Sequence, residues 1–530
     1  MASEKSSSGL SKSCILIIAV ASVERFAYKG VASNLLSYLT DHVKMSTSSA
    51  AKSVSTWSGV TSMLPLASAI LADSYWDRYS TIMASSLLYI VGLVGLTSWA
   101  LLCAWMPTSS LFLPLYLISI GQGGYNPSLQ AFGADQLEMG DGLPCSTEQG
   151  KSDKKSLFFQ WWYFGICSGS LLGNSIMSYI QDTLGWGLGF AIPTGAMAIS
   201  VACFLCGSRF YVHKQLKIPN RPVESIIQAV NLAVTKIKSK SLGLPSRDAV
   251  ELELQEKPLR DGSADCSTSS GRGNSAADEA PGVGKTILRL LPIWTMLLMF
   301  AVIFQQPVTF FTRQGMMMRR SIGGGITIPP AMLQSAITIS IILIMPLYDK
   351  LIIPLLRLLT RQEKGINVLQ RIGIGMCLSV VAMVVAAVVE SKRIGILRTE
   401  GGSHEPLQLD SQLTIFWLLP QYILLGISDV FTVVGMQEFF YMEVPTTMRT
   451  IGIALYLSVF GVGSFLSALL ISVLEWISNA SGKHHNWLSD DTREARLDNY
   501  YWFLALLSSI SFLIFACLCR YYNHLNAAEN

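Results

Sequence analysis

Charged residues are scarce in this sequence: 14% of its 530 residues are Asp, Glu, Lys or Arg, whereas 51% are hydrophobic. A soluble protein of this length needs a far larger charged surface, so the composition excludes a water-soluble globular fold. The net charge of +4 is too small to indicate nucleic-acid binding. The sequence is therefore that of a membrane protein, with lipid as its surroundings.

Histidine is also rare, with six residues, and none lies at the centre of a predicted span. The ten cysteines mostly stand singly within apolar stretches, without the paired spacing of metal or redox sites. The stretch PGVGKT at 281–286 is similar to a phosphate loop, but Glu279 replaces its first glycine and no strand precedes it. We therefore predict no metal site, no cofactor and no enzymatic activity.

Long apolar stretches recur along nearly the whole chain, and each is long enough to cross the hydrocarbon core as a helix of about 20 residues. The sequence predicts twelve spans, at 14–38, 52–72, 79–104, 110–132, 156–180, 187–207, 286–308, 329–352, 367–390, 412–440, 448–475 and 498–520. The first span lacks a small-residue cleavage site and is expected to remain in the mature protein. The expected fold class is an all-α membrane protein.

The polar segment 209–285 divides the chain, because it is rich in Ser, Gly, Asp and Ala and poor in large apolar residues. We predict a largely disordered linker between an N-terminal bundle, 1–208, and a C-terminal bundle, 286–530. The linker begins SRFYVHKQLKIPNR, and its Lys and Arg residues favour the cytoplasmic side of the membrane. Both termini are then expected on the cytoplasmic side as well.

A similar charged stretch follows the second predicted span of each half: ADSYWDRYSTI in the first and PLYDKLIIPLLR in the second. These contain Asp73, Arg78 and Tyr79, and Asp349 respectively. Two related halves indicate a transporter built from parallel repeats, and an acid that pairs with nearby basic residues can latch a gate. Ordinary topology-determining charge explains either stretch alone, but their matching placement favours the gate.

The first span contains three charges, Glu24, Arg25 and Lys29, within the stretch VASVERFAYKG. Ions at such a depth usually line a water-filled pathway, so we favour a functional role for Glu24 and Arg25 over a structural pair within the helix. Lys29 fits two interpretations: a position in the binding pocket, or a side chain that extends to the outer interface. Both remain open from the sequence.

Several blocks together resemble one family: ERFAYKG, ADSYWDRYSTI, FGADQ, FFQWWYFGICSGSLLG, IPPAMLQ, PLYDK and EFFYMEVPTTMRTIGIALYL. They are similar to the plant nitrate/peptide transporter family, a branch of the proton-dependent oligopeptide transporters of the major facilitator superfamily. The resemblance extends from the first span to the eleventh. It implies twelve helices in two six-helix bundles that open alternately to each side of a central substrate site.

The differences from the family pattern fall at its charged positions. The first-span pattern E-x-x-E-R has Ala21 instead of its leading acid, and Asn126 stands where the fourth span usually has a lysine. Lys29 replaces a tyrosine, and Asp429 replaces a glutamate of the tenth span. The resemblance thus implies a more cationic pocket. Because an acid and a base of the coupling machinery are both missing, we also expect weakened or altered proton coupling, carried by Glu24 or Asp429.

Phe304 stands where family members that bind nitrate through the seventh span have a histidine, so that contact is absent. Nitrate, small peptides and small organic anions all remain candidate substrates, with Arg25 or Lys29 as the anion-binding group. The alternative to a carrier is a transceptor, a membrane sensor with little net transport. The vacuolar and plasma membranes are both compatible with the sequence, and the oligomeric state is left open.

Overall fold

The chain is almost wholly helical in the computed structural model, which describes residues 11–529 except 76–77, 103–104, 141–147, 212–274, 324–325, 349–366, 401–412, 444–448, 481–486 and 490–494. One short antiparallel hairpin, β1 (Ser321–Gly323) with β2 (Ile326–Thr327), was not predicted. Most of the predicted linker, 209–285, lies outside the described residues.

The helices of the first half are α1 (Lys12–Ala32), α2 (Leu35–Ser37), α3 (Thr47–Tyr75), α4 (Arg78–Leu102), α5 (Phe112–Gly140), α6 (Glu148–Leu172), α7 (Ser178–Thr183) and α8 (Trp186–Cys206). Those of the second half are α10 (Ser275–Phe304), α11 (Phe310–Met316), α12 (Ser335–Leu347), α14 (Val368–Glu400), α15 (Leu419–Met442), α16 (Arg449–Ala480) and α17 (Leu497–Glu529).

Eight helical stretches among the described residues are long and apolar enough to cross a membrane. They coincide with eight of the twelve predicted spans, and the other four predicted spans coincide with α1, α3, α5 and α6. These four helices carry more polar and small residues, which lowers their hydropathy but not their length. The prediction of an all-α membrane protein with twelve spanning helices is confirmed.

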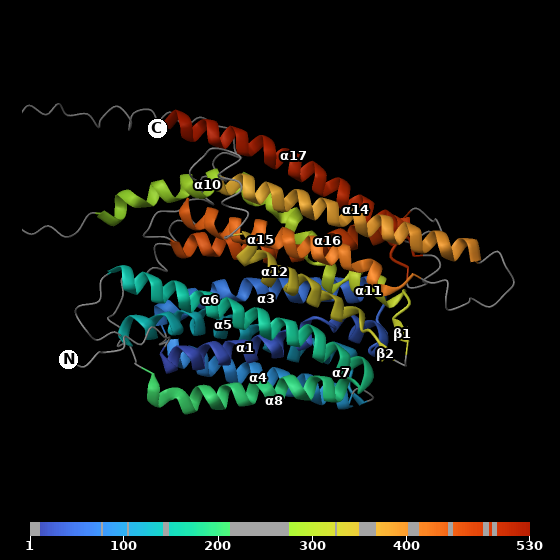
Figure 1. Ribbon diagram of the computed structural model, residues 1–530, viewed down its shortest axis with the longest axis horizontal. Coiled ribbons are helices and arrows are strands. Elements are labelled where there is room, and N and C mark those ends of the chain that lie inside the picture. The colour runs from blue at the N-terminus through green and yellow to red at the C-terminus, as the bar shows by residue number, and fades with distance from the viewer. Residues whose placement is uncertain are drawn as a thin grey trace, which may run out of the picture.

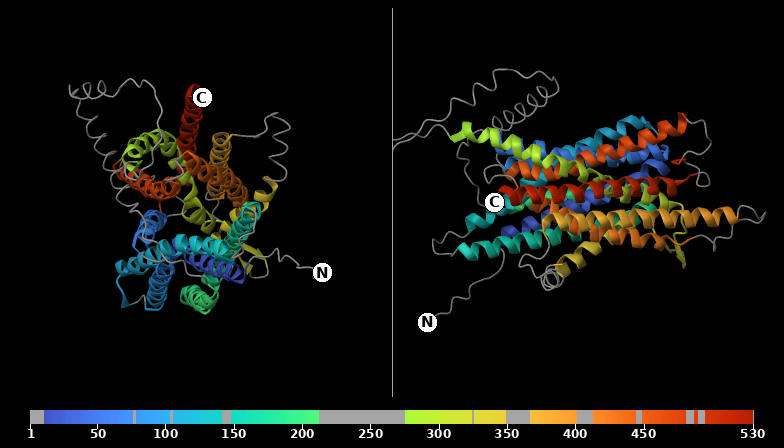
Figure 2. Two further views of the ribbon diagram at one scale, coloured as in Figure 1. Left: turned by 90° about the vertical axis from the view of Figure 1, so that its left-hand side faces the viewer. Right: turned by 90° about the horizontal axis from the view of Figure 1, so that it is seen from above.

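The helices form two bundles that lie side by side, as the end-on view in Figure 2 shows. In the first half, α1 packs against α5, α6 and α8, and α4 packs against α5 and α8. In the second half, α14 packs against α15 and α17, while α10 packs against α16 and α17. The two halves meet where α3 packs against α16 and α6 packs against α12.

Small residues allow α3 and α16 to approach closely at this junction. A Cβ atom on Gly59 would lie 2.9 Å from Cε1 of the Phe465 ring, so a larger side chain would force the helices apart. Ser58 and Ser62 of α3 and Ser464 of α16 lie beside this contact and line a cavity between the halves.

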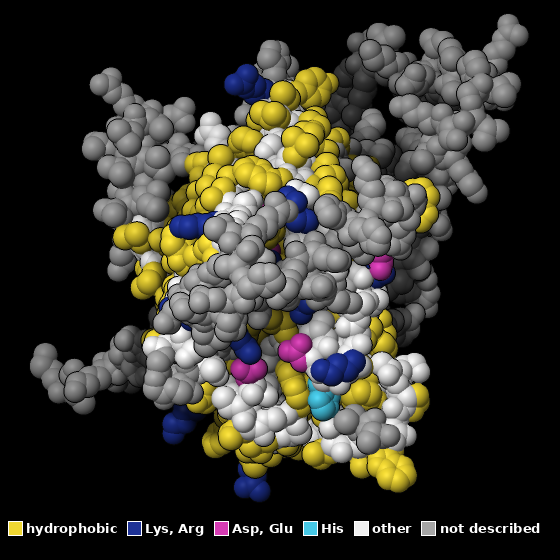
Figure 3. All heavy atoms as spheres, turned by 90° about the vertical axis from the view of Figure 1, so that its right-hand side faces the viewer, with side chains coloured by type: hydrophobic (Ala, Val, Ile, Leu, Met, Phe, Trp, Pro, Cys, Tyr) yellow, Lys and Arg dark blue, Asp and Glu magenta, His cyan; other side chains and the backbone are white. Residues whose placement is uncertain are grey.

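The helix ends define two ends of the molecule. α1 begins, α8 ends, α10 begins and α17 ends at the left of Figure 1, which we call the linker end. The opposite end, with α7, α11, β1 and β2, is the far end. Figure 3 looks onto the far end and shows Lys, Arg, Asp and Glu side chains exposed there, with hydrophobic side chains around the rim.

The first and seventh spans are both interrupted before they reach the far end. α1 ends at Ala32 and α2 starts at Leu35, while α10 ends at Phe304 and α11 starts at Phe310. In the seventh span Pro307 cannot donate a helical hydrogen bond, and Thr309 has non-helical angles of φ −118° and ψ −100°. Side chains replace the lost bonds, since Thr312 Oγ1 donates to the Pro307 carbonyl at 2.7 Å.

Aromatic packing anchors each outer segment to its own half. Tyr38, just after α2, packs against Trp186 and Phe190 with ring centroids 4.8 and 5.0 Å apart. Phe310, at the start of α11, lies 4.7 Å from the Tyr500 ring of α17. The segment beyond each break is therefore attached to the other helices of its own half.

Candidate functional site

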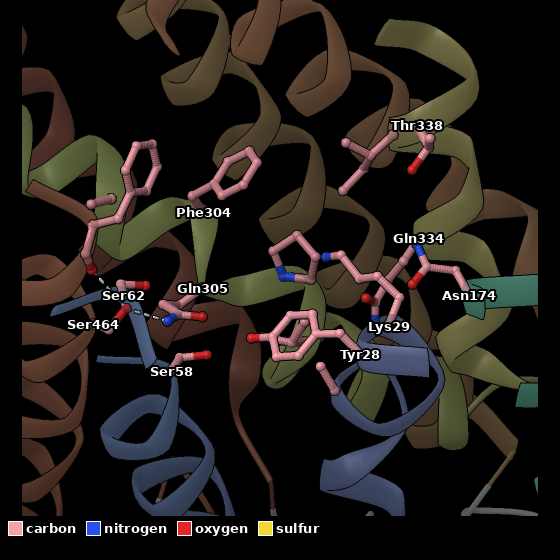
Figure 4. Close-up of a pocket in the computed structure, with 16 residues that line it drawn as sticks. Tyr28, Lys29, Ser58, Ser62, Asn174, Phe304, Gln305, Gln334, Thr338 and Ser464 are labelled. Carbon is pink, nitrogen blue, oxygen red and sulfur yellow. Dashed lines mark hydrogen bonds between the residues drawn. The ribbon is translucent and has the colours of Figure 1, made fainter. Parts of the chain in front are cut away.

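A cavity of about 230 Å³ lies between the two halves. Its lining comes from α1, α3 and the turn after α6 in the first half, and from α10, α12, α16 and the turns next to them in the second (Figure 4). The lining residues are Tyr28, Lys29, Ala32, Ser58, Ser62, Asn174, Ala301, Phe304, Gln305, Pro307, Val308, Gln334, Ile337, Thr338, Phe460 and Ser464.

Lys29 is the charged residue in this lining, and its other polar groups are hydroxyls and amides. Figure 4 shows Tyr28 and Lys29 reaching in from α1, opposite Phe304 at the end of α10 and Gln305 just after it. Gln305 Nε2 donates to Ser464 Oγ, which ties α10 to α16 at the cavity wall. Among the residues that the structure describes, the lining thus offers one cation and several hydrogen-bond donors, and it contains no carboxylate.

Asp429 of α15 faces Lys29 across the junction of the halves, and the two side chains attract each other electrostatically. Tyr163 and Cys167 of α6 and Tyr456 of α16 also lie within the electrostatic reach of Asp429. Lys29 therefore lies in the pocket rather than at an interface with the headgroups, and the acid that attracts it belongs to the opposite half.

Glu24 is 1% exposed and lies inside the first half rather than in the cavity lining. Its electrostatic neighbours are Arg25 and the phenols of Tyr89 and Tyr125, from α4 and α5. Glu24 Oε1 has no hydrogen-bond partner among the described residues. Such an atom marks a place where a water molecule or a proton can supply the missing partner.

Arg25 follows Glu24 on α1 and lies next to Tyr28, which lines the cavity. Its guanidinium lies 5.8 Å from the ring centroid of Tyr28, and that ring stacks on Trp57 at 5.8 Å. Arg25 also interacts electrostatically with Lys29, one turn farther along the helix. Arg25 Nε lacks a hydrogen-bond partner among the described residues, so the guanidinium retains a free donor at mid-membrane depth.

Two further predicted site residues lie in different surroundings. Phe304 lines the cavity, and its ring stacks on Phe300 at 5.8 Å and meets Phe460 edge-on at 5.9 Å. Asn126 is half-buried in α5 and does not belong to the cavity lining. The structure thus brings together Lys29, Arg25, Asp429 and Phe304, but not Asn126.

The predicted gate residues are described only in part. Arg78 forms an ion pair with Asp135 of the FGADQ block, which joins α4 to α5 within the first half. Tyr79 stacks on Phe204 at 5.5 Å, next to Phe132. The side chain of Asp73 and the whole of Asp349 lie outside the described residues, so the proposed latch between them and the basic residues stays a prediction.

Sequence reasoning missed an ion pair inside the second half. Glu390 and Arg393 of α14 are 0% and 4% exposed, and Arg393 Nη2 donates to Glu390 Oε1 at 2.6 Å. Arg393 Nε lies 3.1 Å from both carboxylate oxygens, and Tyr501 of α17 is an electrostatic neighbour. Three charged residues in VVESKRIG, at the end of a predicted span, were the signal available in the sequence.

Contacts between the halves at the far end were also missed. Lys52 Nζ lies 2.6 Å from Glu475 Oε2, and Ser48 donates to the same carboxylate at 3.0 Å. Arg320, beside β1, lies 3.4 Å from Asp182 of α7. Each contact joins segments that are far apart in the sequence, so no local pattern could have indicated it.

Two helical bundles around a cavity, with one cation inside it, define the architecture of a membrane carrier. The sequence model of the POT family matches residues 79–488. Protein NRT1/PTR FAMILY 5.9 of Arabidopsis thaliana is 52% identical, covering 98% of this chain and 97% of that protein. NRT1/PTR FAMILY 5.10 of the same plant is 41% identical, covering 98% of this chain and 94% of that protein.

The fold is also that of solved transporters. The crystal structure of an auto-inhibited POT family peptide transporter superposes with a TM-score of 0.70 at 21% identity, covering 96% of this chain and 97% of the other. The predicted major facilitator fold is therefore confirmed. The chain belongs to the POT family, within its plant NRT1/PTR branch, and is a multi-pass membrane transporter.

Proposed function

We propose that the protein moves nitrate, a small peptide or another small organic anion across a membrane by alternating access of the cavity. The observation that carries this proposal is Lys29, the charged residue in the lining of a cavity enclosed by both halves. The amides and hydroxyls around it, including Asn174, Ser58 and Thr338, can donate hydrogen bonds to oxygen atoms. A cation surrounded by such donors suits an oxyanion or a carboxylate.

The size of the cavity supports the smaller members of this substrate class. Pockets for drug-sized ligands usually measure about 300–1,000 Å³, whereas this cavity measures about 230 Å³. The rings of Tyr28, Phe304 and Phe460 line part of its wall and leave little room for a long side chain. Within the proposed class, a compact monoanion fits better than a bulky peptide.

Contacts between the halves support an alternating-access cycle. The cavity lies on the plane where α3 meets α16 and α6 meets α12, so tilting one half against the other would open it toward one end. The pairs Lys52–Glu475 and Arg320–Asp182 join the halves at the far end. This arrangement is consistent with a carrier state whose far end is closed.

Asp429 competes with the substrate for the Lys29 amine. In the empty carrier its carboxylate attracts Lys29, and an incoming anion competes with it for the same amine. Asp429 would then be left without its cation in a largely dry environment, where accepting a proton relieves the cost of burying a charge. We expect this proton coupling, carried by Asp429 or Glu24, to be weak or altered, because the leading first-span acid and the fourth-span lysine are absent.

We place the linker and both termini in the cytoplasm, from the Lys and Arg residues that follow α8. The far end then faces the vacuolar lumen or the cell exterior. The decisive experiment is a flux screen with purified protein in liposomes, using nitrate, short-chain carboxylates, dipeptides and neutral or cationic solutes of matched size. Saturable flux of a small anion supports the proposal, and flux restricted to neutral or cationic solutes contradicts it.

A further inference from the structure

Gln334 lies in the wall of the cavity, between the interrupted first and seventh spans. It ends the short 3-10 turn Pro330–Gln334 that precedes α12, is 3% exposed and lines the cavity wall (Figure 4). Its amide nitrogen donates to the carbonyl oxygen of Ser33 at 2.9 Å, and Thr312 Oγ1 lies 3.5 Å from the same nitrogen. Both hydrogens of the Gln334 amide group therefore have an acceptor.

The two partners of Gln334 belong to the two interrupted spans. Ser33 follows the end of α1 in the first half, while Thr312 is part of α11 and donates in turn to the Pro307 carbonyl. Helix interruptions leave backbone carbonyls without a helical donor, and a side-chain amide can satisfy them. One buried side chain thus connects the break in the first span with the break in the seventh.

We propose that Gln334 is the clasp that keeps the cavity closed toward the far end. Its bond to Ser33 crosses from the second half to the first, so the halves cannot separate there until this bond breaks. Aromatic packing holds the segment beyond each break to its own half. Separation of the halves at the far end is therefore expected to bend the chain at the two breaks. Gln334 is a positioning residue in this scheme, and the inference rests on the proposed alternating access of the cavity.

The burial of Gln334 distinguishes it from the ion pairs at the far end. The side chains of Lys52 and Glu475 are 28% and 29% exposed, so water and salt screen their attraction. Gln334 is 3% exposed, so bulk water and salt reach the Gln334–Ser33 bond much less than the surface pair. We therefore expect the clasp to contribute more to closure than the surface pair, with a shift in the balance of states of roughly 2- to 10-fold, the usual worth of one hydrogen bond.

The test compares hydrogen–deuterium exchange of purified wild-type protein with that of Gln334→Met, which keeps the length of the side chain but removes its donors. No solute is added, so the result does not depend on which substrate is carried. We expect exchange to increase about 2- to 10-fold around the two breaks, at 31–36 and 306–313, and to stay unchanged at the linker end, at 207–211.

Two variants serve as controls. Thr338→Val removes a hydroxyl that lines the cavity one turn along α12, and Lys52→Met removes the surface ion pair. Both should exchange at the two breaks nearly as the wild type does. The proposal is wrong if Gln334→Met matches the controls, or if its exchange rises equally at both ends of the molecule, which is the pattern of a generally loosened fold. A Gln334→Met protein that does not fold would be replaced by Gln334→Asn, whose shorter amide cannot reach both breaks and should give the same selective increase.

Discussion

At the scale of single residues, the charges of α1 divide into two roles. Glu24 faces the interior of the first half, while Lys29 lines the cavity and Arg25 lies at its edge, over the Tyr28 ring. Successive residues on a helix point about 100° apart, so one stretch can serve both the bundle interior and the pathway. Three charges in a hydrophobic helix thus have distinct neighbours.

Arg25→Ala is expected to reduce uptake at least tenfold while leaving a folded protein. The guanidinium has a free donor at mid-membrane depth and balances the buried Glu24 charge, so its loss removes a charge-assisted contact worth about 1.5–3 kcal/mol. Arg25→Lys keeps the charge but not the planar fork, and should be intermediate. Uptake is measured in liposomes beside a melting curve of the purified protein. Near-normal uptake by Arg25→Ala would remove this residue from the site.

Proton dependence also belongs to the residue scale. Because Ala21 and Asn126 replace two charged members of the family pattern, uptake by the wild type should respond little to an imposed pH gradient. Glu24→Gln or Asp429→Asn should abolish whatever response remains, since each removes one of the acids placed at or beside the site. The measurement is initial uptake with and without the gradient. Steep gradient-driven accumulation that survives both substitutions would refute this assignment.

At the scale of single elements, α14 contains a buried charge pair outside the transport site. Beside it, the Lys392 amine lies 4.1 Å from the ring centroid of Trp417, an arrangement typical of the membrane interface. Glu390 and Arg393 therefore lie near the far end of the span, but face the bundle interior, where Tyr501 of α17 is their neighbour. We expect the pair to hold the end of α14 against α17.

Glu390→Gln should destabilise the protein by about 3–5 kcal/mol, because it leaves the Arg393 guanidinium buried without its counterion. The double variant Glu390→Leu with Arg393→Met, which removes both charges, should recover most of that loss. Thermal melting of the detergent-solubilised protein gives the comparison, and uptake per folded molecule should remain close to that of the wild type. A single variant as stable as the wild type would show that the pair has no structural role.

At the scale of the whole molecule, hydropathy was sufficient to place the spans but not to arrange them. The twelve spans were placed from apolar length alone, because each helix satisfies its own backbone hydrogen bonds within the membrane. The family resemblance then supplied the two-bundle arrangement. What the sequence could not provide was the contact between halves: Gln334 and Ser33 are 301 residues apart, and Lys52 and Glu475 are 423 residues apart.

For the candidate site, the sequence indicated individual residues but not how they are arranged. Charges within α1 identified Glu24, Arg25 and Lys29, since ions are costly in a membrane and seldom lack a function. The choice between a pocket and an interface position for Lys29 depended on which residues line the cavity between the halves, which composition does not reveal. Asn126 was selected from a family pattern, and the structure places it half-buried in α5, outside the cavity lining.

The central claim is that a small anion crosses the membrane through the cavity by binding Lys29. The most direct measurement is initial uptake of the anion identified by the flux screen, in liposomes with wild-type protein or with the double variant Lys29→Met and Asp429→Asn. The double variant removes both partners of the pair, so it does not leave a buried charge unpaired and should remain folded. We predict that the half-saturating concentration rises about 10- to 100-fold, or that uptake is lost, as expected for removal of a charge-assisted contact. Uptake with unchanged affinity by a folded double variant would contradict the account.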